Sequence, residues 1–140
     1  MNKPLVYFLC TGNSCRSQMA EGFLRALGGD RYKVESAGIE AQGLNLHAVQ
    51  AMQEVDIDIS HHQSKIINED ILNRAAYVIT LCGDAEERCP AIWNPQAVKW
   101  HWEFADPAKA AGSEDEIMEQ FRWVRDAIRV RIQQFLDTGH

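Results

Sequence analysis

The chain has 140 residues, 46% hydrophobic and 24% charged, a composition typical of one globular domain over residues 1–140. No apolar run approaches the roughly 20 residues of a membrane span, and the N-terminus leads directly into a strand pattern, so neither a membrane anchor nor a signal peptide is expected. The net charge of −6 argues against nucleic acid as a partner, so local groups must attract any anionic ligand. We expect a cytoplasmic protein with reduced cysteines.

The apolar pattern alternates between the periods of strands and helices. Strands are predicted at residues 5–9, 32–37, 75–81 and 97–102. Helices are predicted at residues 17–27, 46–55, 68–73 and 113–136. Asn45 is a candidate N-cap, and Ser113 with Glu116 has the spacing of a capping box. This alternation predicts an α/β fold with a parallel sheet and helices on both faces, whose ligands bind beyond the carboxyl ends of the strands.

The stretch between the first strand and the first helix has the composition of an anion-binding loop. Five mostly small residues separate Cys10 from Arg16, namely Thr11, Gly12, Asn13, Ser14 and Cys15. Successive backbone N–H groups of such a loop can point inward at an oxyanion, and the following helix adds the positive end of its dipole. Arg16 can hold two anion oxygens, and Ser17 can donate to a Cys10 thiolate. The alternative is a buried structural cysteine beside a surface arginine.

A second pair of cysteines follows the third predicted strand. Cys82 should lie at the same sheet edge as Cys10, and Cys89 comes seven residues later. In a helix these two residues would be about 10 Å apart, whereas a disulfide needs Cα atoms within roughly 7 Å. A Cys82–Cys89 bond would therefore require the segment to unwind or loop out. The alternatives are two unrelated cysteines or a zinc site, and the lack of paired C-x-x-C spacing argues against zinc.

Asp106 follows the fourth predicted strand and should lie at the same edge. A carboxylic acid there can protonate a leaving oxygen, and the alternative is an ordinary turn formed with Pro107. Cys15 is assigned no chemistry of its own, because the donors of the loop are backbone groups. Three histidines, His61, His62 and His101, have no predicted ligand partner, so neither a metal site nor a cofactor is expected.

Together these motifs resemble the thioredoxin-coupled arsenate reductases, a branch of the low-molecular-weight tyrosine phosphatase fold. The similarity extends over nearly the whole chain, in segments 7–22, 35–40, 54–60 and 78–85 and at Cys89-Pro90. It implies a doubly wound sheet of four parallel strands. It also implies residue roles: Cys10 as nucleophile, Arg16 as anion clamp within a substrate-binding loop 11–16, Ser17 as thiolate donor, Asp106 as general acid, and Cys82 with Cys89 as redox relay.

The implied reaction reduces arsenate to arsenite through a Cys10 thiolate–arsenic adduct. Cys82 would then attack the Cys10 sulfur, releasing arsenite and leaving a Cys10–Cys82 disulfide. Attack by Cys89 would give a final Cys82–Cys89 disulfide that thioredoxin reduces. Phosphate and sulfate would compete as oxyanions, no cofactor would be needed, and the protein would act as a monomer.

Two other functions remain as alternatives. A low-molecular-weight protein tyrosine phosphatase, or another phosphomonoester hydrolase, would use the same loop, because phosphate and arsenate are nearly isosteric. Phosphatases of this fold typically carry aromatic residues after the acid, whereas residues 107–112 contain none, which favours a small inorganic oxyanion with some residual phosphatase activity. A non-catalytic oxyanion or thiol sensor is disfavoured by Asp106 and by the complete relay.

The resemblance also concerns a potassium ion that some members of this family hold beside the anion loop. The counterparts of its ligands Asn13, Glu21 and Ser36 are present, but Lys65 occupies the position of an acidic ligand. An ammonium group there would repel a cation. We expect Lys65 to reach Glu21 and to replace the ion, and the alternative is a solvated loop lysine.

Overall fold

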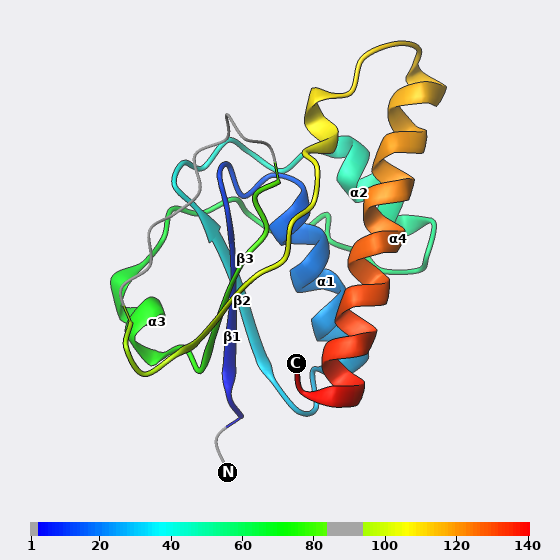
Figure 1. Ribbon diagram of the computed structural model, residues 1–140. Coiled ribbons are helices and arrows are strands. Elements are labelled where there is room, and N and C mark those ends of the chain that lie inside the picture. The colour runs from blue at the N-terminus through cyan, green and yellow to red at the C-terminus, as the bar shows by residue number, and fades with distance from the viewer. Residues whose placement is uncertain (1–2, 84–93) are drawn as a thin grey trace.

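The computed structural model describes residues 3–83 and 94–140. Its centre is one parallel sheet formed by β1 (Leu5–Cys10), β2 (Lys33–Gly38), β3 (Tyr77–Thr80) and β4 (Val98–His101) (Figure 1). The strand order is β2-β1-β3-β4, so the winding of the sheet reverses beside β1. The predicted doubly wound sheet of four parallel strands is thereby confirmed, and the strand reversal places the end of β1 where ligands bind.

Helices cover both faces of the sheet, as predicted (Figure 1). One face carries α1 (Arg16–Gly28), α2 (Leu46–Gln53) and α4 (Glu114–Thr138), and the other carries the short α3 (Glu69–Arg74). Alternate residues of β1 divide between two hydrophobic clusters: Val6 and Phe8 belong to the larger one, and Tyr7 and Leu9 to the smaller. Burial on both faces explains why β1 is a continuous apolar run.

The helix ends follow the predicted capping residues. Asn45 Oδ1 accepts the backbone N–H of His47 at 2.8 Å, and the capping box between Ser113 and Glu116 forms at the start of α4. Leu27, which belongs to the apolar pattern of the predicted helix 17–27, is 42% exposed. The neighbouring Gly28 packs against Leu136 of α4, where a Cβ would lie 2.6 Å from Leu136 Cδ2.

Two further features complete the description. A short 3-10 helix, η1 (Pro107–Lys109), was not predicted beyond a turn at Asp106-Pro107. Asp106 caps it by accepting the N–H of Ala108 at 3.0 Å.

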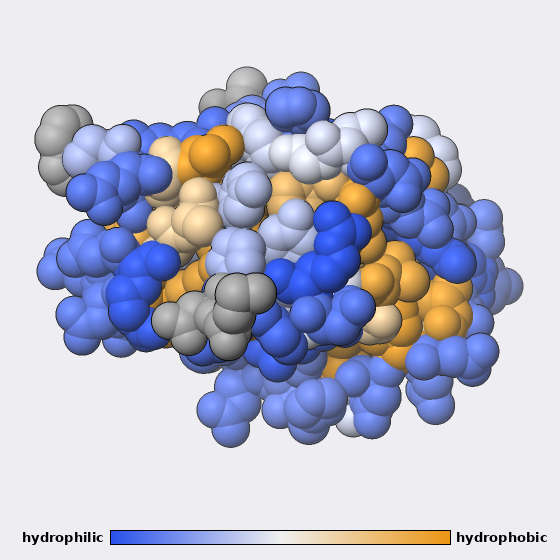
Figure 2. All heavy atoms as spheres, turned by 90° about the horizontal axis from the view of Figure 1, so that it is seen from below, coloured by the Kyte–Doolittle hydropathy of each residue, from blue (hydrophilic) through white to orange (hydrophobic). Residues whose placement is uncertain are grey.

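Across the described ranges, no helix is both long and apolar enough to cross a bilayer. Seen from below, hydrophilic side chains cover most of the surface, with hydrophobic residues in separate patches (Figure 2).

Candidate active site

The loop of residues 11–15 connects β1 to α1 and is supported by the end of β2. Gly38 pairs with Cys10 in the sheet, and a Cβ on Gly38 would lie 2.7 Å from the carbonyl oxygen of Thr11 and 2.8 Å from the amide nitrogen of Asn13. Such separations are shorter than van der Waals contact, so only glycine allows β2 to approach the loop this closely.

The segment after β2, residues 39–45, is bonded to the loop along its length, and we call it the strap. Its backbone N–H groups donate to loop carbonyls in four hydrogen bonds: Ile39 to Cys10 at 3.3 Å, Glu40 to Thr11 at 3.0 Å, Gln42 to Gly12 at 3.0 Å and Asn45 to Ser14 at 3.1 Å. These bonds hold the loop carbonyls toward the strap. The loop is thereby fixed with its carbonyls away from a bound oxyanion, as an anion nest requires.

Cys10 is buried, with its sulfur in contact with two donors. Asn13 N donates to Cys10 Sγ at 3.3 Å, and Ser17 Oγ lies 2.9 Å from the same sulfur. Ser17 Oγ also accepts a hydrogen bond from Asn13 Nδ2 at 2.8 Å. A thiolate carries no hydrogen, so in that state Ser17 would donate to the sulfur while its oxygen accepts from Asn13. Ser17 therefore lies where it can contact the sulfur, and its role as thiolate donor stays a prediction.

Asn13 is the buried centre of a wider hydrogen-bond network. Its φ of 49° lies in the left-handed region, which asparagine tolerates better than most residues. Its amide also donates to Ser36 Oγ at 3.0 Å, and its side-chain oxygen accepts from Gln18 Nε2 at 3.0 Å and from the backbone N–H of Lys65 at 2.8 Å. Contacts from four parts of the chain therefore fix the strained residue that positions Ser17.

Arg16 connects the anion loop to two segments beyond β3 and β4. Its Nη1 donates to the Phe104 carbonyl at 3.0 Å and to the Leu81 carbonyl at 3.4 Å. Its Nη2 lies 3.7 Å from Asp106 Oδ2. The guanidinium is nearly completely buried, so these contacts fix its plane at the edge of the loop. A fixed planar fork suits bidentate recognition of an oxyanion.

The predicted residues of the loop and the acid meet in one pocket of about 320 Å³. Its lining includes the nucleophile Cys10, the clamp Arg16, the acid Asp106, loop residues 11, 12, 14 and 15, and four residues not predicted: Glu40, Gln42, Ala108 and Lys109. No aromatic side chain belongs to the described lining. The structure thus brings a thiol, a guanidinium and a carboxyl group around a space suited to a tetrahedral anion.

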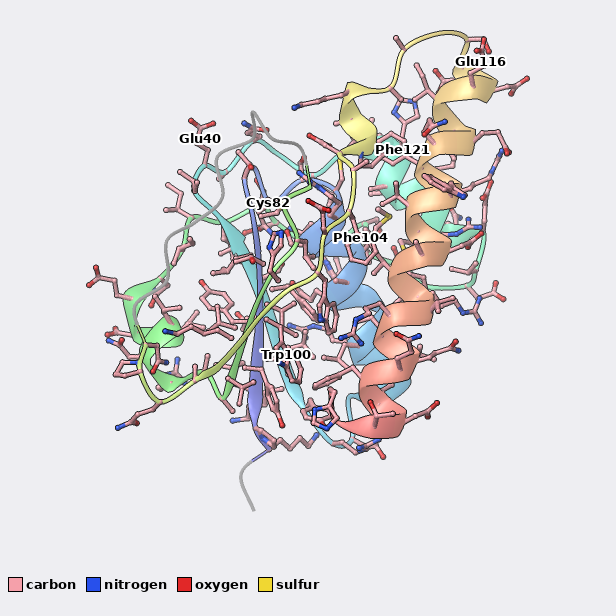
Figure 3. The ribbon with its side chains drawn as sticks, viewed as in Figure 1. Glu40, Cys82, Trp100, Phe104, Glu116 and Phe121 are labelled. Atoms are coloured by element: carbon pink, nitrogen blue, oxygen red, sulfur yellow. The ribbon has the colours of Figure 1, made fainter. Side chains whose placement is uncertain are left out.

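Cys82 is buried directly after β3, at the sheet end where Glu40 and Phe104 also lie (Figure 3). The following Gly83 packs tightly on the segment after β4, since a Cβ would lie 2.1 Å from the Phe104 carbonyl oxygen. That carbonyl is also bonded by Arg16. Cys82 therefore lies at the sheet edge predicted for it, whereas Cys89 lies outside the described residues, and its role stays a prediction.

The second cysteine of the loop differs from Cys10 in its surroundings. Cys15 is buried, and the loss of hydration raises the pKa of its thiol to about 12, although a hydrogen bond from Ser14 opposes the shift. Cys15 therefore remains a neutral thiol at physiological pH. This agrees with assigning it no chemistry.

The expected contact between Lys65 and Glu21 is not formed. Lys65 Nζ lies 3.9 Å from Glu35 and is partly exposed, whereas Glu21 Oε2 is bonded by Arg25 Nε at 3.0 Å. Ser36 Oγ donates to the other oxygen of Glu21 at 2.5 Å. The expectation was wrong because Arg25, one helical turn after Glu21, reaches the carboxylate from α1 itself. Within the described ranges, no three His, Cys, Asp or Glu side chains are grouped to hold a metal ion.

The chain matches the sequence family described as low molecular weight phosphotyrosine protein phosphatase over residues 5–138. It therefore belongs to that family. Among curated relatives, an arsenate reductase of Bacillus subtilis and one of Oceanobacillus iheyensis are each 55% identical over 139 residues, covering 99% of both chains. These relatives place the chain in the arsenate reductase branch of the family, as the sequence motifs indicated.

Solved structures agree with this placement. An arsenate reductase in the reduced state shares 34% identity at a TM-score of 0.79, with 98% of this chain and 99% of that chain covered. An arsenate reductase in a phosphate-binding state shares 34% identity at a TM-score of 0.77, covering 96% and 97%. A thioredoxin-dependent arsenate reductase of Corynebacterium glutamicum shares 28% identity at a TM-score of 0.65, covering 94% of this chain and 63% of that chain.

Several residues that build the site carried no signal in the sequence. Beyond Glu40 the strap belongs to none of the family-like segments, and its hydrogen bonds run through the backbone, so side-chain identity does not mark them. The Leu81 and Phe104 carbonyls that hold Arg16 are invisible for the same reason. Arg25 could have been found, because its spacing of four residues from Glu21 is that of a helical ion pair.

Proposed function

We propose that this protein reduces arsenate to arsenite with Cys10 as the nucleophile. The observation that carries the proposal is the convergence of three groups on one pocket: Cys10 with its serine donor, Arg16, and Asp106. Cys82 at the neighbouring strand end supports a reductive rather than a purely hydrolytic cycle, as do the arsenate reductases among the relatives.

In the first step, an arsenate ion binds in the loop with its oxygens on the backbone N–H groups and on Arg16. The Cys10 thiolate attacks arsenic and forms a sulfur–arsenic bond. One arsenic–oxygen bond breaks, and Asp106 supplies the proton with which that oxygen leaves as water. Asp106 acts as the general acid in this step.

In the second step, Cys82 attacks the Cys10 sulfur as a thiolate. The sulfur–arsenic bond breaks, its electron pair passes to arsenic, and arsenite leaves with arsenic reduced from the +5 to the +3 state. The two cysteines are oxidised to a Cys10–Cys82 disulfide. Cys89 then attacks the Cys82 sulfur, releases Cys10 as a thiolate and leaves a Cys82–Cys89 disulfide.

An external dithiol must reduce that last disulfide, and we propose thioredoxin. The thioredoxin-dependent relative from C. glutamicum supports this choice. We further propose that residues 1–140 act as one domain and one monomer in the cytoplasm, where thiols stay reduced. Phosphate and sulfate would compete with arsenate for the loop.

A phosphomonoesterase is the second candidate function, and the same pocket supports it. The nucleophile, the clamp and the acid would suffice to hydrolyse a phosphate ester through a phosphocysteine. We expect this activity to be weak, because the described lining offers no aromatic surface for an aryl leaving group.

The deciding experiment follows arsenate-dependent NADPH consumption with thioredoxin and thioredoxin reductase, beside hydrolysis of p-nitrophenyl phosphate. Sustained NADPH consumption that requires all three proteins would support the proposal. Hydrolysis without any arsenate-dependent NADPH consumption would identify a phosphatase instead. Tight arsenate binding with neither activity would identify an oxyanion sensor.

A further inference from the structure

Part of the pocket lining belongs neither to the anion loop nor to the segment of the acid. Glu40 and Gln42 of the strap line the pocket together with Cys10 and Arg16. Neither residue has a role in the steps proposed above. Because they line the same pocket as the reacting sulfur, they can influence which substrates enter it.

Gln42 is held against the loop by contacts at both its backbone and its side chain. Its N–H donates to the Gly12 carbonyl at 3.0 Å, and its Nε2 donates to Glu40 Oε2 at 2.9 Å. Its side-chain oxygen lies so close to Gly12 that a Cβ there would be only 2.3 Å away. The carboxamide therefore rests directly on the loop, although the residue faces solvent on its outer side.

This placement has different consequences for two kinds of substrate. An inorganic oxyanion fits within the loop, where backbone N–H groups and Arg16 bind it. A phosphate ester must in addition extend its organic group out of the loop, past the lining. There it would contact a polar carboxamide and the Glu40 carboxylate, and removing those groups from water is costly for an apolar ring.

We propose that Gln42, held in place by Glu40, is a specificity-determining residue that restricts the pocket to small inorganic oxyanions and disfavours aryl phosphate esters. This inference rests on the proposed function only for the identity of the preferred anion. The inference says that the Gln42 side chain narrows the pocket above Gly12. Measurements of anion binding and ester hydrolysis test this without any reduction step.

The test compares the unmodified protein with Gln42→Ala. Two quantities are measured: kcat/KM for p-nitrophenyl phosphate, and the constant for competitive inhibition of that hydrolysis by arsenate. We expect kcat/KM to rise roughly tenfold, the effect of reshaping one wall of a pocket, while the inhibition constant changes less than about twofold. Gln53→Ala, at an exposed glutamine on α2, is the matched control and should change neither.

Two results would overturn the inference. One is an unchanged kcat/KM for the ester in Gln42→Ala. The other is a parallel weakening of arsenate binding, which would make Gln42 a general support of the loop. Failure of the proposed function would look different, since arsenate-dependent NADPH consumption would then be absent from the unmodified protein whatever Gln42→Ala does.

A second variant tests the contact itself. Gly12→Ala adds a Cβ where the Gln42 side-chain oxygen lies, so it must displace Gln42 or the loop. We expect Gly12→Ala to lower ester hydrolysis in the unmodified protein. In the Gln42→Ala background, the loss caused by Gly12→Ala should be several-fold smaller. Equal losses in both backgrounds would show that the two residues do not interact and would contradict the proposal that Gln42 narrows the pocket above Gly12.

Discussion

Asn13 Nδ2 donates a hydrogen bond to Ser17 Oγ over 2.8 Å, and this contact holds the serine oxygen beside the sulfur of Cys10. Ser17 Oγ lies 2.9 Å from Cys10 Sγ, and it would donate to that sulfur when the sulfur is a thiolate. The strained backbone of Asn13 thus contributes to the reactivity of a cysteine that the asparagine side chain does not touch.

Ser17→Ala should reduce the reactivity of Cys10. A hydrogen bond to a charged group is worth about 1.5–3 kcal/mol, so the rate of Cys10 alkylation at neutral pH should fall roughly tenfold or more. Iodoacetamide labelling followed by mass mapping measures this rate. Ser36→Ala is the matched control, because Ser36 accepts from the same Asn13 amide but does not contact the sulfur. An equal loss in both variants would contradict a direct effect of the Ser17 hydroxyl on the Cys10 sulfur.

Cys10→Ser should abolish both arsenate reduction and ester hydrolysis while leaving the fold intact, because both reactions begin with the same thiolate. Circular dichroism checks the fold, and the two assays check activity. Arg16→Lys should also fail, since a single ammonium cannot bind two anion oxygens and also hold the Leu81 and Phe104 carbonyls. Retained turnover in Cys10→Ser would rule out the mechanism.

Cys89→Ala should perform about one reduction per protein molecule and then stop, because nothing resolves the Cys10–Cys82 disulfide. Mass mapping after a single turnover should find that disulfide. Cys82→Ala should stop one step earlier, before arsenite is released. Both variants should keep ester hydrolysis, which needs only the loop, Arg16 and the acid. Normal turnover of Cys89→Ala with thioredoxin would show that the sequential relay is wrong.

Cys15 should resist alkylation in the native protein at pH 8, because burial raises its pKa to about 12. It should react only after unfolding. Since the raised pKa favours the neutral thiol in the folded state, the corresponding stability is complete below the reference value of 9.0 and is lost as the pH rises toward 12. Urea unfolding should therefore show a steeper alkaline loss for the unmodified protein than for Cys15→Ala. Native labelling of Cys15 at pH 8 would contradict this.

Lys65→Ala should change the free energy of unfolding by less than about 1 kcal/mol, since Lys65 forms a partly exposed ion pair with Glu35. Arg25→Ala should cost about 1–3 kcal/mol, because it leaves the buried Glu21 carboxylate without its charged donor. With Arg25 in place, replacing sodium by potassium at constant ionic strength should have no effect on the melting temperature. A potassium-specific rise in the unmodified protein would argue for a bound ion instead.

The sheet and most helices were predictable because their residues are set by local patterns. Buried runs such as residues 5–9 and the capping box at Ser113 depend on near neighbours in sequence. The close packing of Gly28 on Leu136 could not be predicted, because Leu136 lies more than a hundred positions away in the sequence. Such tertiary contacts leave no periodic signal.

In the candidate site, too, residues set by local sequence could be predicted, whereas those set by distant contacts could not. Cys10, Arg16 and Ser17 could be predicted, because one short loop carries all of them, and the location of Asp106 followed from its position after a strand. The expected contact between Lys65 and Glu21 was wrong. A family pattern indicates which position lies near the pocket, but it does not indicate which of several cationic side chains reaches Glu21. Gln42 could not be predicted, because backbone hydrogen bonds position it.

The guanidinium of Arg16 binds the carbonyls of Leu81 and Phe104, which lie 65 and 88 residues after Arg16 in the sequence. Contacts of such long range close large loops of the chain, so the complete oxyanion site exists only in the folded protein. Oxyanions that bind this site select the fully assembled chain and should protect it from unfolding in proportion to their occupancy. Phosphate, which is abundant in cells, would then act on this protein both as a competitor of its substrate and as a stabiliser of its native state.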